Sequence, residues 1–238
     1  MFDFNTNKIL ITGTKSGLGK YLSSFIKGTT NIETQNELNL HKSSSFKIII
    51  HCAGSNSHRF KDFLKLIKNN IILTYKLLRF RSDLFVFFST VDIFSDKFNF
   101  FSLTKYISER IIIFFHSNFL IYRCSAMLGI DMRNNHVNKI LSFKTEKLNL
   151  SFESEFRYIT HQSIFEQILE DINSNKKGIF TLTSKNPKNL KFFCDHYANN
   201  KIGFGEYVYK TKISDKYPII FLDDSEKNFK SYVNLLNE

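Results

Sequence analysis

Residues 8–20, KILITGTKSGLGK, decide the fold of this chain. The apolar run at residues 8–12 predicts a buried strand, and residues 17–27 predict a helix directly after it. The first of three glycines in the turn permits a tight bend, the second lets the backbone approach a pyrophosphate, and the third allows close helix–strand packing. The helix N-terminus adds N–H donors for an anion. Contacts to a dinucleotide are therefore expected from Gly13, Lys15, Ser16, Gly17, Leu18 and Gly19.

The rest of the chain alternates between apolar strands and amphipathic helices, which indicates a parallel sheet covered on both faces. We expect an α/β fold, a Rossmann-type doubly wound parallel sheet with a small C-terminal substrate lobe. Residues 1–184 are assigned to the dinucleotide-binding domain, with 131–156 contributing to the lobe, and 185–238 to the lobe itself. The expected strands are 31–34, 47–51, 84–88, 119–122 and 178–183, and the expected helices are 60–80, 103–116 and 162–172.

Composition excludes several classes of protein. The net charge is +11, but the lysines are spread along the chain without a run of five or six like charges, so nucleic acid is not the expected partner. Cys52, Cys124 and Cys194 are widely separated, which argues for a reducing compartment and against a disulfide frame or a metal site. Residues 1–5 do not resemble a signal peptide, and the densest apolar run, 111–115, is too short to span a bilayer. We therefore expect a cytoplasmic protein with no membrane partner.

Two residues bear on the choice between NAD and NADP. Glu33 lies about 20 residues after the first glycine, where an acid would bind the adenosine ribose hydroxyls and favour NAD. Lys15 could instead meet a 2′-phosphate, or be a solvated loop lysine. The expected cofactor is NAD or NADP, with a slight preference for NAD.

The glycine spacing, TGxxxGxG, resembles the short-chain dehydrogenase/reductase superfamily, and later motifs follow in the order of its extended, sugar-nucleotide branch. Residues 89–94, STVDIF, are similar to the strand end of dTDP-4-dehydrorhamnose reductases. Residues 101–109 match Y-[GS]-x-[ST]-K-x-x-x-E at every fixed position except the first. Residues 122–129 and 157–161 resemble the family's R-x-S-x-x-x-G and R-x-x-x-H segments. The resemblance covers residues 8–183.

This resemblance implies an NAD(P)-dependent reductase or epimerase that acts on a nucleotide-linked sugar in surface polysaccharide synthesis. It is also compatible with a homodimer. It assigns Thr90 to the hydroxyl that bonds the substrate carbonyl, and Lys105 to the cation that holds the nicotinamide ribose. His51 is expected to be a hydrogen-bonded strand-end histidine rather than a ligand. Further cofactor contacts implied by the resemblance are Asn39, Leu40, Ala53, Gly54 and Asn70.

Phe101 stands where the family has its catalytic tyrosine. That tyrosine donates a proton to the alkoxide left by hydride transfer, and a phenyl ring has no such proton. Tyr106 is expected to project from a different helix face, and the YxxxK match at residues 197–201 is interpreted as chance. Two interpretations stay open. The chain is a catalytically impaired dinucleotide-binding protein that serves as a partner or sensor, or it works with another donor such as water or a substrate group.

Overall fold

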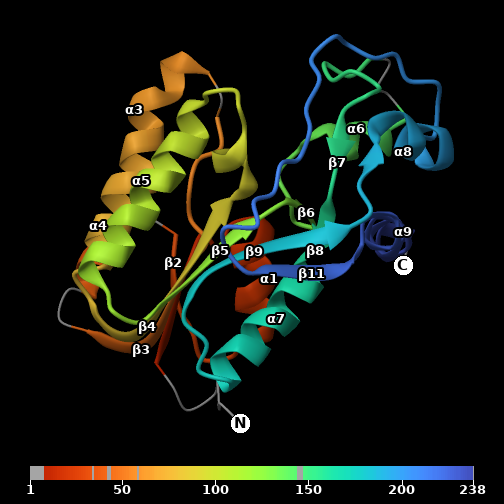
Figure 1. The fold of residues 1–238 in the computed structure, drawn as a ribbon. Coiled ribbons are helices and arrows are strands. Elements are labelled where there is room, and N and C mark those ends of the chain that lie inside the picture. The colour runs from red at the N-terminus through yellow and green to blue at the C-terminus, as the bar shows by residue number, and fades with distance from the viewer. Residues whose placement is uncertain (1–7, 34, 42–43, 58, 144–146, 238) are drawn as a thin grey trace.

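The structure, a computed structural model, describes residues 8–33, 35–41, 44–57, 59–143 and 147–237. Its centre is a seven-stranded sheet in which every pair of neighbouring strands is parallel (Figure 1). In spatial order the strands are β11 (Ile219–Asp224), β9 (Gly178–Lys185), β5 (Phe119–Cys124), β4 (Arg81–Thr90), β3 (Ser45–His51), β1 (Ile9–Thr12) and β2 (Thr30–Ile32).

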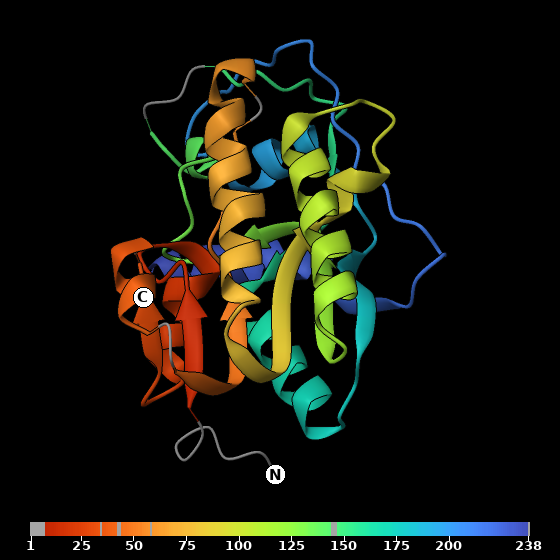
Figure 2. The same ribbon diagram turned by 90° about the vertical axis from the view of Figure 1, so that its left-hand side faces the viewer.

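Helices cover both faces of the sheet because successive strand residues point to opposite sides and both sides are apolar. On β1, Ile9 and Ile11 pack under α1 and α7, whereas Leu10 belongs to the core under α2, α4 and α5. Figure 2 shows the α3–α4 segment and α5 side by side in front of the sheet. The helices of the two layers are α1 (Gly17–Phe25), α2 (Gln35–Leu40), α3 (Phe63–Leu66), α4 (Leu73–Leu77), α5 (Phe100–Phe115) and α7 (His161–Asn173), with a 3-10 turn at Phe60–Asp62 and a π-helix at Ile67–Ile72 between α3 and α4.

A smaller lobe has a core of its own, drawn from two distant parts of the chain. Leu128, Val137 and Tyr158 pack with Phe193 and Phe229 in this second cluster. The lobe lies beyond the carboxyl ends of the strands (Figure 1). The elements of the lobe are β6 (Ala126–Leu128), α6 (His136–Ile140), β7 (Glu155–Phe156), β8 (Tyr158–Thr160), β10 (Lys188–Asn189), α8 (Leu190–Tyr197) and α9 (Ser225–Asn237). A further 3-10 turn, η3 (Val91–Phe94), leads from β4 to α5.

The predicted parallel α/β sheet is confirmed, and each predicted strand and helix overlaps an observed element. The proposed boundary at residue 184 needs correction. Residues 219–224 form β11, which pairs with β9 in the main sheet, so the C-terminal segment is divided between the sheet and the lobe. The weak second strand is Thr30–Ile32; Thr34 and the N-terminal residues 1–5 lie outside the described part of the chain. Within the described residues, no helix is both long enough and apolar enough to cross a bilayer.

Candidate functional site

The glycine turn brings the N-terminus of α1 against the sheet edge. A Cβ on Gly13, whose φ is +80°, would lie 2.7 Å from the backbone nitrogen of Ala53, and a Cβ on Gly19 would lie 2.4 Å from the carbonyl oxygen of Gly13. Neither distance is tolerable, so both positions require glycine. Gly17 has a φ of +60° and no atom within 4 Å of its virtual Cβ. The space above Gly17 is therefore open to a ligand.

His51 joins three elements beneath the turn. Its Nδ1 lies 2.8 Å from the hydroxyl oxygen of Thr12 on β1, and its Nε2 lies 3.0 Å from that of Thr74 on α4. Burial holds the pKa of His51 well below its usual value, with a further contribution from the charge of Lys105. The prediction of a hydrogen-bonded strand-end histidine is confirmed.

Asn70 supports the turn that follows β3. Its Oδ1 accepts from the backbone N–H of Ser55 at 2.8 Å, and its Nδ2 donates to the Ser55 carbonyl at 3.1 Å and to the Thr104 hydroxyl at 2.8 Å. Asn70 sits in the π-helix and is buried, with 1% of its surface exposed. These hydrogen bonds fix the turn at Ser55 and tie it to α5. Direct contact of Asn70 with the cofactor stays a prediction.

A cleft opens between the glycine turn, the turn after β3 and the N-terminus of α5. It consists of an inner hollow of about 280 Å³ and an outer hollow of about 220 Å³, and Gly13, Ser16, Gly54 and Arg133 line both. The outer hollow is completed by Thr12, Lys15, Ile32, Glu33, Ala53, Asn69 and Leu73. The inner hollow is completed by Gly17, Leu18, Gly19, Cys52, Ser55, Asn56, Phe88, Ser89, Phe101, Lys105, Met127, Met132, Asn134, Asn135 and His161. The whole predicted glycine loop therefore faces one cleft.

Phe101 and Lys105 both line the inner hollow, as their spacing on one helix face predicts. The side chain of Asn99 caps α5 by accepting from the backbone N–H of Ser102 at 2.7 Å, which fixes the first helical turn. The Lys105 ammonium donates to the Phe88 carbonyl at 2.7 Å and lies 4.5 Å from the centre of the Phe87 ring. Burial lowers the pKa of Lys105 to about 8.

The strand end offers two hydroxyls rather than one. Thr90 ends β4 as predicted, but its Oγ1 accepts from the backbone N–H of Asp92 at 3.1 Å, and its side chain lines neither hollow. Ser89 does line the inner hollow, on the side of β4 that also carries Phe87. Its buried Oγ has no hydrogen-bond partner among the described residues. The role of Thr90 stays a prediction, and Ser89 is a second candidate that the motif match did not reveal.

The outer hollow is mixed in charge. Glu33 and Lys15 both line the outer hollow, and their charged groups lie 3.4 Å apart. Asn39, on α2, is exposed and lines a separate hollow with Lys76 and Arg79, outside both parts of the cleft. Its contact with adenine stays a prediction. The side chain of Leu40 lies outside the described part of the structure.

The inner hollow is positively charged. Lys105 and Arg133 line it, the N-terminus of α1 points into it, and no Asp or Glu stands among its described lining residues. Burial lowers the pKa of His161 to about 4, so this ring adds no charge near neutral pH. An anionic group fits this surface, whereas a cation does not.

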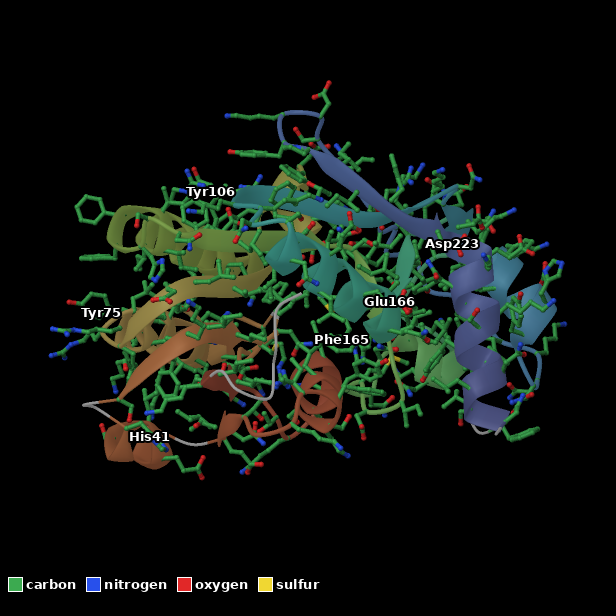
Figure 3. The ribbon with its side chains drawn as sticks, turned by 90° about the horizontal axis from the view of Figure 1, so that it is seen from below. His41, Tyr75, Tyr106, Phe165, Glu166 and Asp223 are labelled. Atoms are coloured by element: carbon green, nitrogen blue, oxygen red, sulfur yellow. The ribbon has the colours of Figure 1, made fainter. Side chains whose placement is uncertain are left out.

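Neither alternative tyrosine reaches the cleft. Tyr106 follows Lys105 but has 43% of its surface exposed, and Figure 3 shows it on the outer side of α5. Tyr197 is the last residue of α8 and packs 4.9 Å from the ring of Phe229 in the lobe core. Because the helix ends there, Lys201 does not share a helical face with it. The interpretation of this YxxxK match as chance is confirmed.

Comparisons with known proteins give a consistent result at the level of the fold. No family model and no curated protein matches the chain. A dTDP-4-dehydrorhamnose reductase from Clostridium acetobutylicum superimposes with a TM-score of 0.77 at 17% identity, over 97% of this chain and 100% of that one. The Bacillus anthracis dTDP-4-dehydrorhamnose reductase in complex with NADP gives 0.76 at 16% identity, over 96% and 99%. A Tyr-to-Phe mutant of the Bacillus cereus UDP-glucuronic acid 4-epimerase, in complex with NAD and a fluorinated UDP-glucuronic acid, gives 0.74 at 16% identity, over 96% and 99%.

This chain shares the fold of these solved proteins. The resemblance noted from the glycine turn and the residues around Lys105 therefore extends to the whole backbone. Within that fold the cleft lies at the carboxyl ends of β1, β3 and β4, which is where open parallel sheets bind their ligands.

The glycine turn yields a matched pair of substitutions. Gly19→Ala should destabilise the protein by roughly 3 kcal/mol or more, because its new methyl group collides with the backbone of Gly13. Gly17→Ala meets no atom and should cost roughly 1–2 kcal/mol from its positive φ alone. Chemical denaturation measures both values. A Gly19→Ala protein as stable as the wild type would contradict the packing described here.

Proposed function

We propose that the chain is an NAD(P)-dependent reductase or epimerase acting on a nucleotide-linked sugar. The observation that carries this proposal is the inner hollow, where the glycine turn, Lys105 and the N-terminus of α1 converge without an opposing carboxylate. Solved proteins of the same fold hold NADP, or NAD together with a UDP-sugar. The proposed role of the protein in surface polysaccharide synthesis rests on the sequence resemblance alone.

The residues present fit a nicotinamide dinucleotide. The open space above Gly17 would take the pyrophosphate, Glu33 and Lys15 would meet the adenosine ribose, and Lys105 would donate to the nicotinamide ribose. When bound, the cofactor would supply or accept a hydride. Ser89 or Thr90 would polarise the substrate carbonyl through its hydroxyl; a hydroxyl that already accepts one hydrogen bond, as in Thr90, still has a proton to donate.

The proton for the substrate oxygen has to come from a group other than Phe101. Among the described residues that line the inner hollow, the titratable side chains are Cys52, Lys105, Arg133 and His161. Burial raises the pKa of Cys52 far above neutrality and lowers that of His161 to about 4, so neither changes charge near pH 7, and arginine keeps its charge throughout. Lys105, with a pKa of about 8, is the member that can release a proton, directly or through water.

Phe101 also favours a second candidate function, a dinucleotide-binding protein without turnover that serves as a partner or sensor. Its ring lines the inner hollow one helical turn before Lys105, at the position that the sequence resemblance assigns to the proton donor. In the epimerase crystal complex a tyrosine is replaced by phenylalanine, and that protein still holds both NAD and the sugar nucleotide. A protein of this fold with a tyrosine replaced by phenylalanine can therefore still bind both ligands.

The first test is cofactor binding. NAD or NADP at 100 times its dissociation constant should stabilise the fold by about 2.7 kcal/mol and raise the melting temperature. Gly17→Glu should remove the shift, because its side chain fills the space left for the pyrophosphate and adds a negative charge there. Gly17→Ala controls for the backbone strain that both variants share. If neither dinucleotide moves the melting curve of the wild type at millimolar concentration, the proposal is wrong.

Dinucleotide affinity should depend on pH through Lys105. Since its pKa is lowered to about 8, the ammonium is present at pH 7 and is lost as the pH rises through 8. The dissociation constant should therefore increase several-fold between pH 7 and pH 9.5, where the phosphodiester charges of NAD do not change. Calorimetric titration at each pH measures this, and Lys105→Met should give a flat profile. The same slope in both proteins would show that another group titrates.

Restoring the hydroxyl tests catalysis. Phe101→Tyr places a phenol one helical turn before the Lys105 ammonium, which favours its ionised form. Steady-state turnover on a panel of sugar nucleotides should rise ~10²-fold or more. High wild-type turnover that the new tyrosine leaves unchanged would identify a different donor. Cofactor binding with no turnover in either protein would favour the binding-protein function.

A further inference from the structure

The segment between β6 and α6 crosses the mouth of the cleft. On one side the carbonyl of Asp131 accepts from the backbone N–H of Gly17 at 2.6 Å, and the Asp131 carboxylate lies 2.6 Å from the Lys20 ammonium on α1. On the other side Arg133 donates to the carbonyl of Gly54 at 3.0 Å and to the side-chain oxygen of Asn56 at 3.3 Å. The segment therefore ties the glycine turn to the turn after β3.

Arg133 is the charged residue at the centre of this crossing. It lines both the inner and the outer hollow, so its guanidinium stands where one meets the other. A dinucleotide that spans the cleft would have its nucleosides in the two hollows and its diphosphate between them. No carboxylate lies within ion-pair distance of Arg133 among the described residues. Its positive charge is therefore not neutralised by the protein.

The two hydrogen bonds of Arg133 leave most of its N–H donors available to a ligand. A guanidinium carries five N–H donors, and two neutral acceptors occupy only part of them. Its planar fork matches two oxygens of one phosphate, which a lysine ammonium cannot do. The Gly54 carbonyl and the Asn56 amide hold the fork beside the open space over Gly17.

We propose that Arg133 is a diphosphate-binding residue, which closes over the dinucleotide from the lobe side and faces the N-terminus of α1 across the phosphates. This inference rests on the proposed function and extends it, because it assigns to the β6–α6 segment a contact that no motif in the chain predicts. The glycine turn then binds the diphosphate from below through backbone donors, and Arg133 binds it from above through its side chain.

The test compares ligands with and without a diphosphate. ADP-ribose has the diphosphate, adenosine has none, and the dissociation constants of both are measured by NMR titration. Arg133→Gln should weaken ADP-ribose binding on the order of tenfold and leave adenosine unchanged, since hydrogen bonds to a charged group are lost only for the first ligand. Arg133→Lys keeps the charge without the fork and should recover part of the affinity.

Arg81→Gln serves as the matched control. Arg81 is exposed at the opposite end of β4, so its substitution removes the same charge away from the cleft and should change neither affinity. Equal ADP-ribose affinities for the wild type and Arg133→Gln would overturn the role of Arg133 and leave the proposed function standing. A wild-type protein that binds neither ADP-ribose nor NAD would overturn both.

Discussion

The contact of Gly19 with the carbonyl of Gly13 is the constraint on which the site depends. Because neither residue has a side chain, α1 begins directly against the glycine turn. For the same reason Gly13 packs against the backbone of Ala53, just after β3. Three chain segments thereby meet at the carboxyl edge of the sheet and line one cleft. A larger residue at either position would separate the helix from the sheet and close the space above Gly17.

A polar network behind this contact joins the elements that line the cleft. His51, neutral because it is buried, joins β1 to α4, and Asn70 ties the turn after β3 to α5 through Thr104. These groups make their hydrogen bonds within the protein. Lys105 and Arg133 are the charged side chains that line the inner hollow in the described part of the chain. The site is thus a positive surface supported by a neutral scaffold.

Much of this arrangement could be predicted from the sequence, because it depends on local spacing. The glycine turn, and the pairing of Phe101 with Lys105 one turn apart, need only a strand, a helix and their periods. The contacts that could not be predicted come from tertiary placement. Arg133 reaches the cleft because the segment after β6 folds back over it, and Asn39 on α2 lines a separate hollow. Ser89 and Thr90 are adjacent hydroxyls on a strand, so a shift of one residue exchanges the face each one occupies.

The most direct test of this account is a crystal structure of the protein grown with NAD or NADP. The account predicts a diphosphate over Gly17, within hydrogen-bond distance of the first backbone N–H groups of α1, with the nicotinamide beside Phe101 and its ribose on Lys105. A dinucleotide bound elsewhere, or a cleft that stays empty at saturating cofactor while Lys105 keeps its bond to Phe88, would contradict it.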